Sequence, residues 1–263
     1  MSLEQPSIVW HNKFPFGERV CRSVAEKQAV GEYVIQKYIQ PHATVFLSDG
    51  SSTFHMSLRL FHSPRPLTLL TTNVAIAVER AVREEKESVR QMEVDLAGGI
   101  VDSELLMVRG DMTEDTIQTW ISRSDVLVVS MRSFSCRTGP TERHPPSQRQ
   151  ISLACRTALK MSKKIVILAD HAKMSREMDE SHDTSVFSSA EEWEAATKSG
   201  HLWLITNRPP NPILGGNSAW ICDKVVKDKE LKRFIAHSRY LHTMLSRRYV
   251  EFPFNLVEQL SNQ

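Results

Sequence analysis

Short runs of apolar residues recur along the chain, and each is too short to form a helix. The five runs lie at 44–47, 67–70, 126–129, 165–169 and 202–205. They are rich in leucine and β-branched residues and do not alternate with polar residues. This pattern is typical of strands buried on both faces, as in a parallel sheet.

Between these runs, apolar residues recur at helical spacing. Helices are predicted around 24–38, 54–61, 74–82 and 151–159. Asn73 is a good N-cap directly after a strand, while Ser147 with Gln150 and Ser189 with Glu192 match the capping box. The alternation of strand and helix predicts an α/β fold, with a mostly parallel sheet covered by helices on both faces.

The composition is that of a globular protein with one substantial core. The chain has 263 residues, of which 41% are hydrophobic and 24% are charged, and this excludes disorder, collagen and coiled coils. Its formal net charge is +2, so the chain as a whole has no electrostatic reason to bind nucleic acid or an anionic membrane. Function must therefore be sought in local sites.

The sequence also indicates a compartment. No apolar run approaches the roughly 18 residues of a transmembrane helix, and the segment 1–14 lacks the apolar stretch of a signal peptide. We therefore expect a cytoplasmic protein without membrane contact. The cysteines lie far apart and form no C-x-x-C pair, so we expect buried structural thiols; they are Cys21, Cys136, Cys155 and Cys222.

The most informative segment is the turn that follows the first predicted strand. There Asp49 and Gly50 lead into Ser51, Ser52 and Thr53, just before the predicted helix at 54–61. Gly50 permits a tight backbone, and the first amides of a helix are unsatisfied donors that point toward an anion. A phosphate or carboxylate site is one interpretation of this turn, and ordinary helix capping by hydroxyl residues is the other.

Other strand ends carry polar residues or glycines that fit the same interpretation. One strand ends at Thr72 and Asn73, and a further element, 94–100, contains Gly98 and Gly99, where a ligand could approach the backbone. The apolar run 165–169 delivers an acid, a histidine and a lysine at Asp170, His171 and Lys173. In an α/β sheet such carboxyl ends lie together and form the ligand site.

Two loop-like segments, 133–146 and 213–217, interrupt the alternation. We interpret 133–146 as a loop that closes over the pocket, because Arg132, Arg137 and Arg143 could meet a phosphate, or else as a surface loop with scattered charges. From 223 to 248 the chain turns helical and basic. That helix is either docked with a solvated charged face or a contact for another subunit or an acidic partner.

Taken together in order, these residues resemble the sugar-phosphate sensor domain of DeoR-type bacterial transcriptional regulators. The resemblance covers roughly residues 22–207, and its best motif is the Leu-Ala-Asp-His-Ala-Lys run that ends at Lys173. The remaining matches are Glu26-Lys27, the strand and turn at 45–53, Thr72-Asn73, Gly98-Gly99, Gly110, Asp125 and Gly139. The family shares its three-layer α/β fold with ribose-5-phosphate isomerase, glucosamine-6-phosphate deaminase and CoA transferases, so the resemblance implies that fold.

The resemblance also implies roles for individual residues. It makes the four residues Gly50, Ser51, Ser52 and Thr53 the phosphate loop, with Lys173 as a cation that faces the bound anion. It makes Thr72-Asn73 and Gly98-Gly99 further walls of the pocket, and it places Asp49 and Asp170 in the ligand site. One departure is local: the family turn has its acid directly after the strand, where this chain has Ser48 and then Asp49.

The second departure concerns the N-terminus. Regulators of this type carry a winged helix-turn-helix of roughly 55 residues before the sensor, whereas about 21 residues precede the matching helix here, so we expect no direct nucleic-acid module. The expected organisation is a leader over 1–21, a sensor-like α/β domain over 22–207 and a helical extension over 208–263, packed on the same domain. We expect a homo-oligomer.

Two functions remain open from the sequence. The favoured one is a stand-alone effector-binding domain that binds a phosphorylated sugar or related phosphometabolite and acts in regulation through oligomer or partner contacts, with no cofactor and no catalytic residue. The alternative is a sugar-phosphate isomerase or aminosugar-phosphate deaminase that uses a carboxylate as general base. The candidate bases are Asp49, Asp95, Asp102, Glu104 and Asp170.

Metal and serine-nucleophile chemistry find no support in the sequence. The histidines show no H-x-x-x-H or H-E-x-x-H pair, and no G-x-S-x-G elbow occurs.

Overall fold

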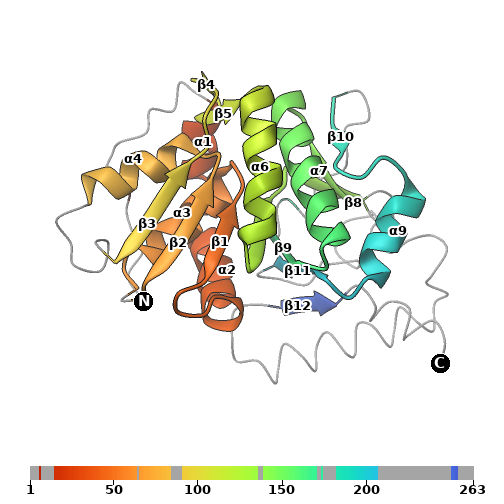
Figure 1. Ribbon diagram of the computed structural model, residues 1–263, viewed down its shortest axis with the longest axis horizontal. Coiled ribbons are helices and arrows are strands. Elements are labelled where there is room, and N and C mark those ends of the chain that lie inside the picture. Colours follow the sequence, from red (N-terminus) through yellow and green to blue (C-terminus); the bar gives the residue numbers. More distant parts are fainter. Residues whose placement is uncertain are drawn as a thin grey trace.

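A seven-stranded sheet organises the structure, in the strand order β12-β11-β9-β6-β1-β2-β3 (Figure 1). The computed structural model describes residues 6, 15–63, 65–83, 91–135, 139–170, 173, 182–206 and 250–253. Six neighbouring strands of the sheet are parallel, and only β12 runs antiparallel, against β11. The prediction of a mostly parallel α/β sheet is therefore confirmed.

The five predicted apolar runs form the central strands of this sheet. They are β1 (Thr44–Leu47), β2 (Leu67–Thr71), β6 (Val126–Ser130), β9 (Lys164–Ala169) and β11 (Leu202–Thr206). The edges are β3 (Met92–Leu96), which belongs to the glycine-containing element of the sequence, and β12 (Val250–Pro253), which no sequence pattern predicted. β12 lies within the segment where we expected a helical extension, so that part of the extension is a strand.

Helices cover both faces of the sheet and create three layers (Figure 1). One face carries α1 (Pro15–Cys21), α2 (Val24–Tyr38), α3 (Ser51–Leu60) and α4 (Val74–Val82). The other carries α6 (Asp111–Arg123), α7 (Pro145–Lys160) and α9 (Ala190–Lys198). Because side chains alternate along a strand, Val45 and Leu47 enter the first core, while Phe46 enters the second.

Two of the predicted N-caps are confirmed in the structure, and two helices begin earlier than the sequence predicted. The side chain of Asn73 accepts a hydrogen bond from the amide of Ala75, and Ser189 accepts one from the amide of Glu192. The capping box at Ser147 is wrong, because α7 already begins at Pro145, where a proline suits the first turn of a helix. The helix predicted over 54–61 likewise begins earlier, at Ser51.

The prediction of a loop over 133–146 is also wrong. This stretch contains β7 (Ser133–Ser135) and β8 (Gly139–Glu142), an antiparallel pair that β10 (Thr184–Ser185) extends to three strands. Phe134 packs edge-on against Trp193 of α9, with ring centroids 5.7 Å apart. Pairing and packing with residues forty or more positions away override the loop-like composition, and no local pattern shows such partners.

The chain before the family-like region forms part of the core. Phe16 of α1 is fully buried and packs edge-on against Phe54 of α3, with ring centroids 5.6 Å apart. The backbone amide of Phe16 also donates to the carbonyl of Glu104, in the turn between β4 (Ile100–Asp102) and β5 (Met107–Arg109). The basic helix predicted over 223–248 and the loop over 213–217 lie outside the described residues.

Among the described residues, no helix is both long and apolar enough to cross a membrane. Cys155 is a buried free thiol, as expected, whereas Cys21 is exposed, so the prediction of a buried thiol is wrong at that position. Cys136 and Cys222 lie outside the described residues.

The contact between α2 and α3 generates a prediction about Gly31. A Cβ atom at this position would lie 2.9 Å from both Cα and Cβ of Met56, so Gly31→Ala forces the two helices apart. We expect the free energy of unfolding to fall by about 1–3 kcal/mol, although alanine normally stabilises a helix interior relative to glycine. Urea denaturation measures the change.

The control for this prediction is Gln36→Ala, at an exposed position of the same helix, which should change the free energy of unfolding by less than about 0.5 kcal/mol. If Gly31→Ala stabilised the protein, α2 and α3 would not approach each other as closely as this structure shows.

Candidate functional site

The candidate site lies at the point where the strand order of the sheet reverses. The neighbouring strands β1 and β6 continue to β2 on one side and to β9 on the other, so the connections from β1 and from β6 leave in opposite directions. In open α/β sheets this reversal opens a crevice at the carboxyl ends of the two central strands, where ligands bind. Here Ser48 follows β1 and Ser130 ends β6, and both are buried.

The turn after β1 brings its backbone close to the end of β6. Gly50 is the N-cap of α3 and has a φ of +114°, a region that favours glycine. A Cβ atom at Gly50 would lie 2.8 Å from Oγ of Ser130, so a larger residue would collide with β6. The glycine is therefore required by both the conformation and the close approach.

Several side chains hold this turn in shape. Oγ1 of Thr53 donates to the carbonyls of Ser48 and Gly50, at 2.8 and 2.9 Å. Nδ2 of Asn73, at the end of β2, donates to the same carbonyl of Gly50 at 3.1 Å. The predicted residues Thr53 and Asn73 thus join the turn, and both of these side chains make bonds within the protein.

The first turn of α3 carries amide groups directed out of the helix. The amides of Ser51, Ser52 and Thr53 have no acceptor inside the helix, because the first amides of any α-helix lack one. The three residues are buried at the carboxyl ends of β1 and β6. Together with the helix dipole, these donors favour a negatively charged group at this position.

Lys173 brings a positive charge to the same helix start. Its Nζ donates to Oγ of Ser52 at 2.8 Å and to Oγ of Ser130 at 3.2 Å. The lysine follows β9, and Asp170 fixes its backbone by accepting from the Lys173 amide through both its carbonyl and its Oδ1. Residues 121 positions apart in the sequence therefore meet, as the resemblance implied.

Asp49 lies within the turn at 48–53, the candidate anion-binding turn, as a buried carboxyl group that is only 3% exposed. Its Oδ2 accepts a hydrogen bond from Oγ of Ser147 at 2.7 Å, while its Oδ1 has no partner among the described residues. Burial, and then the negative charge of Glu142, raise the pKa of Asp49 from 3.8 to about 6. The side chain can thus accept a further hydrogen bond through Oδ1.

Two more titratable side chains have shifted pKa values that depend on Lys173: Lys27 of α2 and His55 of α3. Lys27 is buried, and its Nζ donates to the carbonyls of Arg19 and Arg22. Burial, and then the positive charge of Lys173, lower the pKa of Lys27 from 10.5 to about 7. Burial also lowers the pKa of His55 to about 4, which keeps the ring neutral while Nε2 donates to the carbonyl of Val20.

The glycine pair predicted to line the pocket packs against other elements. The carbonyl of Gly98 accepts from Oγ1 of Thr113, in the first turn of α6, at 2.7 Å. A Cβ atom at Gly99 would collide with Thr113 and with the carbonyl of Arg109. The sequence predicted that a ligand approaches the backbone of this glycine pair, and in the structure atoms of Thr113 and Arg109 approach it closely. Thr72 is buried, and its carbonyl accepts from the amide of Val108.

Two of the arginines that we predicted to meet a phosphate, Arg132 and Arg143, form ion pairs with Asp183 instead. Nε of Arg132 and Nε of Arg143 both lie 3.1 Å from Oδ1 of the buried Asp183. This shared ion pair ties β7 and β8 to the chain before β10. Arg137 and His171 lie outside the described residues.

The sequence did not single out Ser130 or Ser147 as site residues. Ser130 could have been found, because it follows an apolar run as Ser48 does. The sequence pattern did point to Ser147, but as the N-cap of a helix and not as a site residue. Within the described part of the chain, no group of three His, Cys, Asp or Glu side chains is placed to hold a metal ion.

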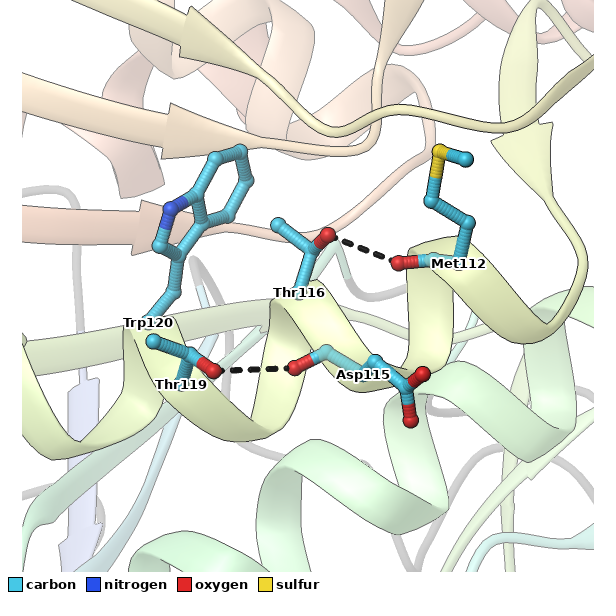
Figure 2. A pocket seen from close by; sticks show the side chains of 5 residues that line it. All are labelled: Met112, Asp115, Thr116, Thr119 and Trp120. Carbon is cyan, nitrogen blue, oxygen red and sulfur yellow. Dashed lines mark hydrogen bonds between the residues drawn. The ribbon is translucent and has the colours of Figure 1, made fainter.

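An open groove of about 490 Å³ is lined by residues of α6 (Figure 2). Its lining residues are Met112, Asp115, Thr116, Thr119 and Trp120. The hydroxyls of Thr116 and Thr119 donate to carbonyls of their own helix, as Figure 2 shows. The lining contains one acid and no cation, so this groove does not suit a phosphate.

Comparisons with solved structures give low sequence identities. The chain resembles eIF2B delta from Chaetomium thermophilum, with 7% identity, a TM-score of 0.43, and coverage of 64% of this chain and 53% of that one. For translation initiation factor eIF-2B from Pyrococcus horikoshii OT3 the values are 10%, 0.41, 60% and 50%. For ribose 5-phosphate isomerase from Plasmodium falciparum they are 11%, 0.38, 56% and 52%. The chain spans about half the length of these proteins.

No protein of curated function matches the sequence. The sequence does match the family described as the DeoR C terminal sensor domain, over residues 22–182, which is more than half of the chain. The match includes the anion-binding turn, the strand ends around it and Lys173. The chain therefore belongs to the DeoR C-terminal sensor domain family, a family of regulatory domains that bind small-molecule effectors.

Proposed function

We propose that this protein is an effector-binding domain that binds a phosphorylated sugar or a related phosphometabolite, with the phosphate at the N-terminus of α3. The observation that carries the proposal is the contact of Nζ of Lys173 with the hydroxyls of Ser52 and Ser130. This contact places a cation directly at a helix start whose amides favour an anion.

In the proposed binding mode, backbone amides and one lysine bind the phosphate, and other side chains hold these groups in place. The amides of Ser51, Ser52 and Thr53 donate to the phosphate oxygens, and Lys173 neutralises part of their charge. Thr53 and Asn73 hold the turn, while Asp170 holds Lys173. A lysine suits this role, because it recognises phosphate as a compact point charge on a flexible stem.

We further propose that the domain acts in regulation in the cytoplasm, through oligomer or partner contacts that depend on the bound effector. Membership in a family of regulatory sensor domains supports this part of the proposal. Light scattering coupled to size exclusion, with and without a saturating phosphorylated ligand, tests it. A mass that stays that of a monomer in both states would exclude homo-oligomerisation as the mechanism.

One observation favours a second function, that of a sugar-phosphate isomerase or aminosugar-phosphate deaminase. Burial gives Asp49 a pKa of about 6, which is near the value a general base needs, and leaves Oδ1 without a partner. The other candidate bases are less suited. Asp95 and Glu104 are exposed, Asp102 pairs with Arg109, and Asp170 holds Lys173. Proton NMR of a bound sugar phosphate in D₂O distinguishes the two functions, because turnover exchanges a carbon-bound proton and simple binding does not.

Removing the cation tests the proposed phosphate site. Lys173→Met should weaken the binding of inorganic phosphate and of phosphorylated sugars by about 10–100-fold, because it removes a charge-assisted hydrogen bond worth about 1.5–3 kcal/mol. Ser52→Asp should weaken it further, because it places a negative charge where the anion binds. Thermal shift and isothermal titration calorimetry measure the loss.

The matched control for the phosphate site is Lys160→Met, which removes an exposed lysine from the last turn of α7. This variant should bind phosphate as the unchanged protein does. Equal affinities for Lys173→Met and Lys160→Met would remove Lys173 from the site.

Asp49→Asn generates a prediction about stability and pH. A carboxyl group whose pKa is raised on folding stabilises the folded state below its unfolded pKa, and this contribution is lost as the pH rises through the folded pKa. The difference between 3.8 and about 6 corresponds to about 3 kcal/mol, at 1.36 kcal/mol for each pH unit.

We therefore expect Asp49→Asn to be more stable than the unchanged protein by roughly 1–3 kcal/mol at pH 7, with the difference vanishing toward pH 4. Urea denaturation of both proteins from pH 4 to pH 7.5 measures it, and titration of His55 cancels because both proteins contain it. A pH-independent difference would mean that Asp49 is not buried as an isolated carboxyl group.

A further inference from the structure

Oδ1 of Asp49 and Nη2 of Arg19 are among the buried polar atoms that have no hydrogen-bond partner within the described part of the chain, and they are the two that belong to charged groups acting on each other. A buried polar atom without a partner destabilises the folded state, so native proteins normally satisfy such atoms. One is an acceptor and the other a donor of the opposite charge. Their state suggests that a ligand group completes both.

The Arg19 guanidinium belongs to the neighbourhood of Asp49. Burial dominates the pKa of Asp49, but the positive charge of Arg19 also acts on it and lowers it. Burial likewise lowers the pKa of His144, the N-cap of α7, and Arg19 adds to that shift. The charge of Arg19 therefore acts on both Asp49 and His144, although no ion pair joins Arg19 to Asp49.

Side chains of α2 and α3 hold the backbone of α1, the helix that carries Arg19. Nζ of Lys27 donates to the carbonyl of Arg19, and Nε2 of His55 donates to the carbonyl of Val20. Phe16 packs against Phe54, the residue that follows the first turn of α3. Nε of Arg19 donates to the carbonyl of Pro15, which leaves Nη2 as the atom that lacks a partner. The helix that starts at the anion site thus also fixes α1.

The charges around the two atoms select what can lie between them. A second phosphate or a carboxylate would accept from Arg19 but would be repelled by Asp49 and by the buried Glu142. An ammonium group would be repelled by Arg19. A hydroxyl group can do both tasks at once, because it donates its proton to one oxygen and accepts through its lone pairs.

We propose that Arg19 and Asp49 clamp one hydroxyl group of the ligand, which donates to Oδ1 of Asp49 and accepts from Nη2 of Arg19. This inference rests on the proposed function, since the phosphate of the same ligand occupies the start of α3. It makes the ligand a polyhydroxylated monophosphate, and it disfavours bisphosphates and phosphorylated sugar acids. Arg19 precedes residues 22–182, so this contact lies outside the family match.

The test compares Arg19→Met with Arg22→Met by isothermal titration calorimetry. Methionine keeps the apolar stem of the arginine, and Arg22 is a matched control because its side chain is exposed and pairs only with Glu18 in the neighbouring turn. The probes are inorganic phosphate, ribose 5-phosphate, fructose 6-phosphate, glucitol 6-phosphate, fructose 1,6-bisphosphate and 6-phosphogluconate. Melting temperatures without ligand establish that each variant is folded.

The expected result is selective. At least one of the three hydroxylated monophosphates should bind more tightly than inorganic phosphate, and Arg19→Met should weaken it by about 10–100-fold. The affinity for inorganic phosphate should change less than threefold, because Arg19 does not contact the phosphate in the proposed binding mode. Arg22→Met should leave both affinities unchanged.

A double-mutant cycle with Asp49→Ala, which removes the acceptor oxygen, tests the shared hydroxyl. If both side chains hold one group, the double variant should lose little more affinity than either single variant. Additive losses would overturn the clamp and assign two separate ligand groups. Tight binding that is insensitive to Arg19→Met, or no monophosphate binding better than inorganic phosphate, would overturn it as well. Failure of inorganic phosphate to bind, together with no effect of Lys173→Met, would instead overturn the proposed function.

Discussion

The parallel pairing of β1 with both β2 and β6 is the constraint on which the rest of this structure depends. The chain continues from β1 to β2 and from β6 toward β9, so the carboxyl ends of β1 and β6 lie where the strand order reverses. The start of α3 brings amide groups to this place. The candidate anion site is thus a consequence of the strand order, and Gly50 permits the close approach of this turn to β6.

Charged side chains of both signs lie around the start of α3, and each changes the pKa of its neighbours. Burial, and then the positive charge of Lys173, lower the pKa of Lys27, and the negative charge of Asp170 opposes that effect. Asp49 and Glu142 form an acidic side next to this basic one. A ligand with a phosphate at one end and hydroxyl groups at the other matches this distribution, because it places its negative charge on the basic side only.

Helix α1 connects this site to the beginning of the chain. Its contacts come from Phe54 and His55 of α3 and from Lys27 of α2, so the groups that hold α1 lie directly behind the anion-binding turn. The elements that hold α1 in place therefore also carry the candidate site.

The sequence by itself determined the five central strands, the caps at Asn73 and Ser189, the turn at 48–53 and the role expected of Lys173. These features depend on local patterns: buried parallel strands are continuously apolar, and a glycine followed by hydroxyl residues begins a helix. Only the tertiary structure decided that Ser130 and Ser147 join the site, that Gly98 and Gly99 pack against α6, and that 133–146 contains two strands. It also decided that the positive charge of Arg19 acts on Asp49. Each of these depends on partners tens of residues away, and the sequence pattern of one segment carries no information about which distant segment will pack against it.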